Sequence, residues 1–229
     1  MGEALIYGLI ASSALVLGSL LGLRGRLPRH LEATILAFAG GALTAAMAYE
    51  LFGDAFEIGG TGLAASGLLA GAALFIVVDA YLVKHLRKRA TGPALLAGAI
   101  IDGVPENLAL GTALATGGGS LALLVAIFVS NFPEALAGTA DMPSHRSRSR
   151  IFLAWCVAAV FLVIPTLAGY ALLQDAQPAV VAATEAFAGG AVLALVANSI
   201  LPEAYREGGP WVAFATVAGF LVSFMLSPR

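Results

Sequence analysis

The feature that most constrains this chain is a succession of eight apolar runs, each about 20 residues long and joined by short connections rich in Gly, Pro and Arg. A helix needs roughly that many apolar residues to cross the hydrocarbon core of a bilayer. Only 11% of the residues are charged and 59% are hydrophobic, whereas about 25% are charged in an average soluble domain. We therefore expect an all-α polytopic membrane protein, one transmembrane domain over 1–229, with helices near 4–23, 31–52, 62–84, 92–116, 119–141, 150–173, 178–202 and 210–227.

The basic residues predict how these helices are oriented. Eleven of the 12 Lys and Arg residues fall in alternate connections, and the other connections have none. Because basic loops stay on the cytoplasmic side, the pattern predicts eight crossings of the plasma membrane with both termini outside. The cytoplasmic set is Arg24, Arg26, Arg29, Lys84, Arg87, Lys88, Arg89, Arg146, Arg148, Arg150 and Arg206, and Arg229 is the exception.

Two internal repeats suggest that the chain is a duplicated unit. FAGGALTAAMAYELFGDAFEIGG (38–60) aligns without gaps to FAGGAVLALVANSILPEAYREGG (187–209), and GVPENLALG (103–111) to NFPEALAGT (131–139). In the expected topology the members of each pair cross the membrane in opposite directions. The prediction is a 3+2+3 inverted repeat, a plan found in many transporters. The alternative is that FAGGA is only a small-residue packing motif used twice.

Acidic residues inside apolar runs point to a functional site. An acid at the centre of a membrane helix costs roughly 2.5–3.5 kcal/mol on insertion scales, and such groups usually line an ion or proton path. Asp102 and Glu106 are four residues apart and so share one helix face, as do Ser130 and Glu134, with Asn131 beside them. If the two helices face each other, these five residues form one oxygen-rich pocket, and their charges favour a bound cation or protonation.

The prolines of the two motifs add backbone oxygens to this pocket. Pro105 and Pro133 have no N–H, so the carbonyls of Ile101 and Val129 each lose a helical partner. Asn107 is about 100° round the helix from Glu106 and serves either the same site or a neighbouring helix. The alternative is that the polar groups only join helices, which we expect for Asp79, near Lys84. Glu50 is a weaker candidate ligand, and His30, His85 and His145 are expected to be solvated loop residues.

These motifs resemble those of the ZIP family of divalent metal transporters, of which the chain would be a divergent, prokaryotic-type member. The resemblance covers nearly the whole chain: eight helices, FAGGA at the start of the second and seventh, and Pro-Glu motifs on the fourth and fifth. It implies that Glu106 and Glu134 hold the transported metal and that Ser130 and Asn131 match the polar pair of the fifth helix. It also implies alternating access and is compatible with a homodimer.

The chain departs from the family pattern at several ligand positions. Asp102 stands where the family usually has histidine, and Gly103 where it has asparagine. Ile164 replaces a glutamate that many relatives carry before the proline of the sixth helix, which favours one metal site over two. On the seventh helix, Asn198 and Ser199 stand where acids are common. The remaining donors are all oxygen atoms, which suit Mn²⁺ or Mg²⁺ and still accept Zn²⁺ or Fe²⁺.

The sequence thus predicts a carrier that moves a divalent cation of the Zn, Fe and Mn class into the cytoplasm, with the bilayer as its environment. It predicts no catalytic residues, no prosthetic group and no nucleic-acid partner. A proton-coupled carrier of a small organic solute and a ZIP-like protein without transport activity stay open. An intramembrane aspartyl protease using Asp79 and Asp102 is disfavoured because the GxGD motif is missing.

Overall fold

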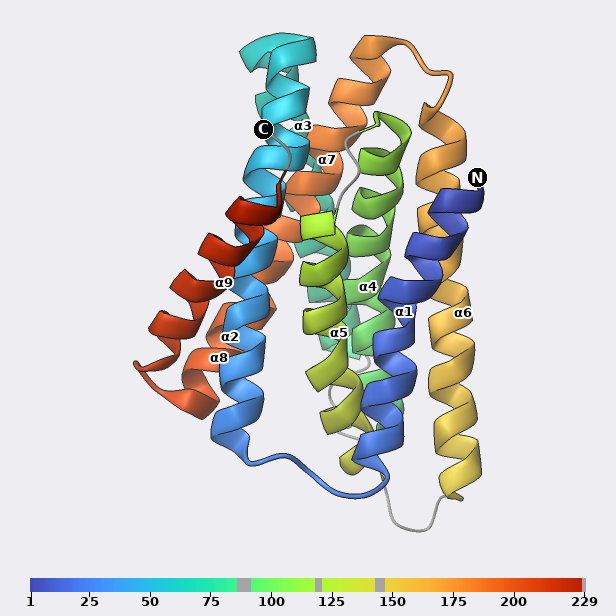
Figure 1. Ribbon diagram of the computed structural model, residues 1–229, viewed down its shortest axis with the longest axis vertical. Helices are drawn as coiled ribbons and strands as arrows, with labels where there is room; N and C mark the ends of the chain where they lie inside the picture. Colours follow the sequence, from blue (N-terminus) through green and yellow to red (C-terminus); the bar gives the residue numbers. More distant parts are fainter. Residues whose placement is uncertain (86–91, 118–120, 143–146, 228–229) are drawn as a thin grey trace.

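The computed structural model of the chain is a bundle of helices that run along its long axis (Figure 1). It describes residues 1–85, 92–117, 121–142 and 147–227, leaving aside the side chains of 82–85 and 92–95. Within these ranges every regular element is helical. The elements are α1 (Gly2–Gly22), α2 (Arg29–Ala46), the π-helical η1 (Met47–Phe52), α3 (Gly53–His85), α4 (Gly92–Ala115), α5 (Leu121–Ala140), α6 (Arg148–Leu173), α7 (Pro178–Leu195), the π-helical η3 (Val196–Ile200), α8 (Leu201–Gly208) and α9 (Val212–Leu226).

Two of the expected helices, 31–52 and 62–84, belong to one continuous helical stretch. α2, η1 and α3 follow one another from Arg29 to His85, and inside α3 only Gly60 has non-helical torsion angles, with φ 70° and ψ 175°. α7, η3 and α8 are continuous in the same way. The described residues therefore form seven continuous stretches, and the expected eight separate helices are wrong in this respect. The connection shrinks to a single glycine because only glycine takes a positive φ without steric cost.

The chain reverses its direction at Gly60, as its neighbours along α7 show. Up to Gly60, the neighbours on α7 move toward the start of α7 as the residue number rises. After Gly60, the neighbours move toward the end of α7. The two parts of the stretch therefore run antiparallel, although no loop separates them. The neighbours before the glycine are Leu51 beside Gly189 and Gly59 beside Ala182, and those after it are Gly67 beside Ala186 and Gly71 beside Ala191.

Apolar helices of membrane-spanning length make up most of the described chain. Five are long and apolar enough to cross a bilayer, and α9 is a shorter apolar helix. α4, which carries Asp102, Glu106 and Asn107 in its middle, is not among the five. These properties fit a membrane protein. The five are Gly2–Gly22, Arg29–Tyr81, Leu121–Ala140, Arg148–Leu173 and Pro178–Gly208.

The two stretches that align in sequence also share their irregular features. α2 begins at Arg29 and α7 begins 149 residues later at Pro178. Each is followed by a π-helical segment, η1 or η3, whose starts have the same separation. Gly60 and Gly209, also 149 residues apart, have φ of 70° and 69°. Equivalent positions of the two stretches thus adopt equivalent backbone conformations.

The helices pack as one bundle. α3 lies along α7 and α2 along α9, while α1 packs against α5 and α6, and α4 packs against α6. Contacts of α2 with α5 and of α4 with α7 join these sets. Glycines permit the closest approaches, as is usual between membrane helices. A Cβ atom at Gly71 would stand 1.9 Å from the Phe187 carbonyl oxygen, and one at Gly219 would stand 1.9 Å from that of Phe38. Phe187 follows Phe38 by 149 residues, so the contact recurs in both repeats.

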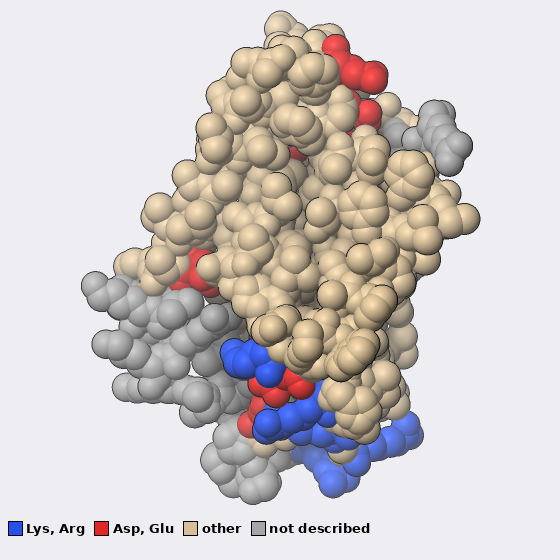
Figure 2. Space-filling model, turned by 90° about the vertical axis from the view of Figure 1, so that its left-hand side faces the viewer, with Lys and Arg blue, Asp and Glu red and all other residues tan. Residues whose placement is uncertain are grey.

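Basic side chains gather at one end of the bundle. Figure 2 shows the Lys and Arg side chains of the visible face only at its lower end, whereas acids lie there and also at the upper end. Arg26 forms a salt bridge with Asp141, and Arg29 lies 3.6 Å from Glu207. Both chain ends lie toward the opposite end (Figure 1). Of the predicted cytoplasmic set, Arg87, Lys88, Arg89 and Arg146 lie outside the described residues, as do Arg229 and the side chain of Lys84.

Candidate functional site

The two Pro-Glu motifs lie inside regular helices. α4 contains Pro105 and α5 contains Pro133, and both helices continue through their prolines. Each proline lacks an N–H, so neither can donate the usual hydrogen bond to the carbonyl four residues earlier. Membrane helices tolerate such a loss where neighbouring helices or polar side chains satisfy the freed groups.

A hydrogen bond joins the two motifs. The Ser130 hydroxyl lies 3.1 Å from one carboxylate oxygen of Glu106 and 3.3 Å from the other, and it donates to this group. It also lies 2.9 Å from the carbonyl oxygen of Ile127 in its own helix, an alternative acceptor. Glu106 is 2% exposed and Ser130 is fully buried. The structure therefore brings together two of the predicted ligands, one from each motif.

Asn131, beside Ser130, is a buried amide with unused bonding capacity. Its side chain is 1% exposed. Neither its oxygen nor its nitrogen has a hydrogen-bond partner among the residues that the structure describes. Buried polar groups in folded proteins nearly always have a partner. The amide oxygen of Asn131 could therefore bind a ligand that reaches this part of α5, although the side chain points about 100° round the helix from that of Ser130.

Asn107 is engaged elsewhere, in a link between α4 and α6. Its side-chain nitrogen donates to the Gly103 carbonyl oxygen at 2.9 Å, and its side-chain oxygen accepts from the Thr166 hydroxyl at 3.2 Å. Both side chains are fully buried. Of the two roles that the sequence left open for Asn107, the structure favours contact with a neighbouring helix.

The other predicted ligands take different positions. Asp102 is 8% exposed and lies one turn before Glu106 on α4. Glu134 is half-buried, one turn after Ser130 on α5. Glu50, in η1, is 5% exposed and accepts a hydrogen bond of 3.0 Å from the Ser227 hydroxyl, which places it against α9.

The carboxylates do not gather into a ready-made metal centre. Within the described ranges, no group of three or more His, Cys, Asp and Glu side chains is placed to hold a metal ion. Asp102, Glu106 and Glu134 therefore do not converge in this conformation. A cation at Glu106 would depend on hydroxyl and amide oxygens from Ser130 and Asn131 as well, all of which are donors that hard divalent cations accept.

The structure describes the surroundings of three positions where the chain departs from the ZIP pattern: Ile164, Gly103 and Asn198. Ile164 is 57% exposed, so this position faces away from the buried interior of the bundle. A Cβ atom at Gly103 would lie 2.5 Å from a methyl group of Leu162, so a larger residue there would displace that side chain. Asn198 donates a 2.8 Å hydrogen bond to Asp79. Asp79 thus joins α3 to η3, and the side chain of its expected partner, Lys84, lies outside the described residues.

The sequence interpretation missed several buried polar residues, of which Thr166 and Glu185 bear most on function. Thr166 follows the α6 proline and completes the link to Asn107. Glu185, which the sequence places toward a helix end, is fully buried in α7. The signal for Glu185 was present, because it is the only charged residue in the run PAVVAATEAFAGGAVLAL. Of the three histidines, His30 is exposed, the side chain of His85 is not described, and His145 lies outside the described residues.

Comparison with known proteins adds no assignment. No protein-family model matches the chain, and no curated protein matches its sequence. The resemblance to ZIP transporters therefore depends on the motifs and their spacing alone.

Proposed function

We propose that the chain is a ZIP-like transporter that carries a divalent metal cation of the Zn, Fe and Mn class across the plasma membrane into the cytoplasm. The observation that supports this best is the buried contact between Glu106 and Ser130, where the two Pro-Glu motifs meet. The amide of Asn131 lies next to this contact in the chain and has bonding capacity to spare. Asp102 and Glu134 complete the donor set once the helices adjust around the ion.

Electrostatics favours an ion at this place. A buried carboxylate is costly unless it is paired, hydrogen-bonded or neutralised. One hydroxyl donor offsets only part of that cost at Glu106, and a divalent cation would offset the rest. An all-oxygen site favours harder cations, so Mn²⁺ is the first candidate and Zn²⁺ and Fe²⁺ follow.

The resemblance implies alternating access, in which a first group of helices, α1, α4, α5 and α6, would move against a second group, α2, α3, α7 and α9. The contacts of α2 with α5 and of α4 with α7 lie between the two groups and would be the surfaces that slide. The proposed site lies between two members of the first group, so that group would carry the ion as it moves against the second. In the proposed 3+2+3 inverted repeat, α1–α3 and α6–α9 are the two halves, and α4 and α5 lie between them. Counting the reversal at Gly60 as a turn between two crossings gives eight crossings with both termini outside.

Metal uptake tests the proposal. The full chain, reconstituted in vesicles with a metal-sensitive dye inside, should take up Mn²⁺ or Zn²⁺, and Glu106→Gln should lower the rate at least about tenfold, because it removes the buried charge that binds the ion. Ser130→Ala should give a smaller loss. Glu57→Gln, at an exposed acid of α3, is the matched control and should keep the wild-type rate. Equal uptake by Glu106→Gln and Glu57→Gln would disprove the site.

A second candidate is a proton-coupled carrier of a small organic solute. It is favoured by Glu185, a fully buried acid that the proposed metal site does not use. Isothermal titration of the purified protein with a panel of divalent cations separates the two functions. Binding of one metal ion per chain, weakened in Glu106→Gln, supports metal transport, and the absence of saturable binding supports the solute carrier. Saturable binding without uptake identifies a protein that has lost transport.

A further inference from the structure

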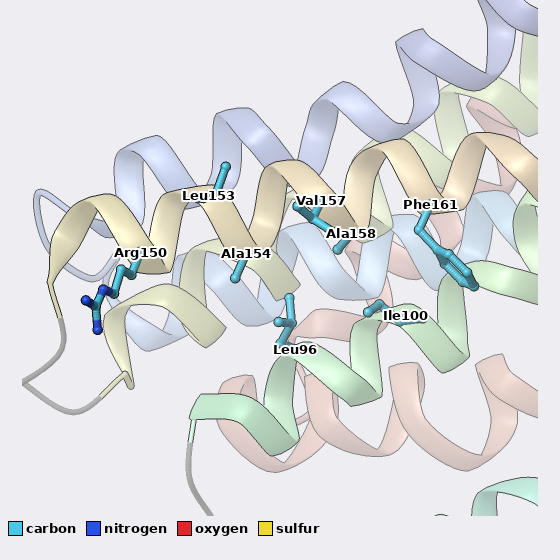
Figure 3. Close-up of a pocket in the computed structure, with 8 residues that line it drawn as sticks. All are labelled: Leu96, Ile100, Arg150, Leu153, Ala154, Val157, Ala158 and Phe161. Carbon is cyan, nitrogen blue, oxygen red and sulfur yellow. The ribbon is translucent and has the colours of Figure 1, made fainter.

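A groove between α4 and α6 opens on the outer side of the bundle. Its volume is about 530 Å³, within the range of ligand-binding pockets. Figure 3 shows Leu96 and Ile100 of α4 facing Ala154 and Ala158 of α6 across it, with Arg150 at one end and Phe161 at the other. The lining consists of Leu96, Ile100, Arg150, Leu153, Ala154, Val157, Ala158 and Phe161.

The walls of the groove are apolar and face the surroundings of the bundle. Leu153 and Val157 are 62% exposed and Phe161 is 46% exposed. They lie on α6, one of the helices long and apolar enough to span a bilayer. The medium next to this groove is therefore hydrocarbon, and the molecule most available to fill it is a lipid chain.

One end of the groove carries a positive charge. Arg150 is the only charged residue of the lining, and it forms no salt bridge with any described residue. It lies in the first turn of α6, at the end of the bundle where the other described basic residues gather. A long cationic side chain at the end of a spanning helix reaches toward the headgroup region while its stem stays in apolar surroundings.

We propose that the α4–α6 groove holds an acyl chain of an anionic phospholipid, with the lipid phosphate bound by Arg150. The apolar walls match the chain, and the guanidinium matches a phosphate, with which it can form two hydrogen bonds. Basic pockets between membrane helices on the cytoplasmic side are known to bind anionic headgroups. A zwitterionic lipid fits less well because its positive group would stand near Arg150.

Two pairs of matched variants isolate the parts of this site. Arg150→Gln removes the cation, and Arg148→Gln is its control, since Arg148 is exposed in the same turn and does not line the groove. Ala154→Phe fills the apolar part, and Val160→Phe is its control, since Val160 is 67% exposed on the same helix outside the groove. Circular dichroism and size-exclusion chromatography report whether each variant is folded.

Native mass spectrometry of the delipidated protein in mild detergent measures the binding. Palmitoyl-oleoyl phosphatidylglycerol, phosphatidylcholine with the same chains, and oleate are the probes. The wild type should retain one phosphatidylglycerol in preference to phosphatidylcholine. Arg150→Gln should lower the affinity for phosphatidylglycerol about fivefold, as expected for one cation near an anionic lipid. Ala154→Phe should weaken both phospholipids, and neither control should change binding.

Each contrary result overturns the proposal. Equal retention of the two phospholipids by the wild type excludes an anionic headgroup site. Equal losses in Arg150→Gln and Arg148→Gln indicate general attraction to the basic end. Wild-type binding by Ala154→Phe places the lipid elsewhere, and oleate binding as tight as phosphatidylglycerol binding identifies a fatty acid. Because none of these measurements uses metal, they are independent of the proposed transport function.

Discussion

At the scale of single residues, two adjacent buried polar side chains of α4 bond to different neighbouring helices. Glu106 contacts α5 through Ser130, whereas Asn107 contacts α6 through Thr166. These adjacent residues contact two different helices because their side chains point about 100° apart round the axis of α4. Only the first contact belongs to the candidate site, and the second holds α4 in place next to it.

The second contact can be tested by its effect on stability. Thr166→Val preserves the shape of the side chain and removes the donor to Asn107. It should lower the unfolding free energy by about 0.6 kcal/mol, the average for hydrogen bonds between membrane helices, and at most about 1.7. SDS-induced unfolding in bicelles is the measurement. Thr34→Val is the control, since the Thr34 hydroxyl bonds a carbonyl of its own helix, and an equal effect in both variants would refute an interhelical role.

At the scale of elements, the two similar stretches place polar residues in π-helical segments. Glu50 in η1 bonds to Ser227 at the end of α9, and Asn198 in η3 bonds to Asp79 in α3. π-Helical turns occur often at functional positions of helices. Here each turn presents a polar side chain to the helix packed beside it, α9 for η1 and α3 for η3. The close glycine contacts at Gly71 and Gly219 join the same helical stretches.

The glycine contacts predict equivalent effects of substitution in the two halves. Gly71→Ala and Gly219→Ala each put a methyl group against a backbone carbonyl, so each should cost about 1–3 kcal/mol of stability through overpacking. Gly62→Ala has open space around it and a negative φ, so it should be neutral or slightly stabilising. Thermal unfolding in detergent compares the three. A neutral Gly71→Ala would show that α3 and α7 are less closely packed than described.

At the scale of the whole molecule, the basic end and the chain termini lie at opposite ends of the bundle (Figures 1 and 2). This arrangement agrees with the predicted orientation, in which basic connections face the cytoplasm. The end of α5 and the start of α6 lie at the basic end, and the connection between α6 and α7 lies at the other. The two ends of α6 should therefore be accessible from opposite sides of the membrane.

Cysteine labelling tests this orientation. In a Cys156→Ala background, which removes the single native thiol, Asp175→Cys lies between α6 and α7 and Ser147→Cys lies before α6, both at exposed positions. A membrane-impermeant maleimide should label Asp175→Cys in intact cells and Ser147→Cys only after lysis. The reverse pattern would invert the orientation, and labelling of both in intact cells would disprove a crossing by α6.

The amino-acid sequence by itself determined the helical class, the approximate limits of the apolar helices and the two motifs that meet at the candidate site. These features depend on local composition and on fixed spacings along a helix, so they can be inferred without tertiary contacts. The closeness of Glu106 and Ser130 was expected, because each lies on the polar face of its helix beside a Pro-Glu motif and the two helices were expected to face each other. The aligned stretches likewise anticipated the equivalent positions of Gly60 and Gly209.

Only the tertiary structure decided how polar groups are shared among neighbouring helices. Asn107 is directed to Thr166, Glu50 to Ser227 and Asp79 to Asn198. Each of these partners comes from another helix, and the rotation of one helix against another depends on the packing of both. The tertiary structure also decided that Arg29–His85 is one continuous helical stretch. A single glycine can replace a loop there because the helical segments on either side of it both pack along α7. The spacing of residues along the sequence determines which side chains share a helix face. The packing of the helices determines which residues of other helices that face contacts.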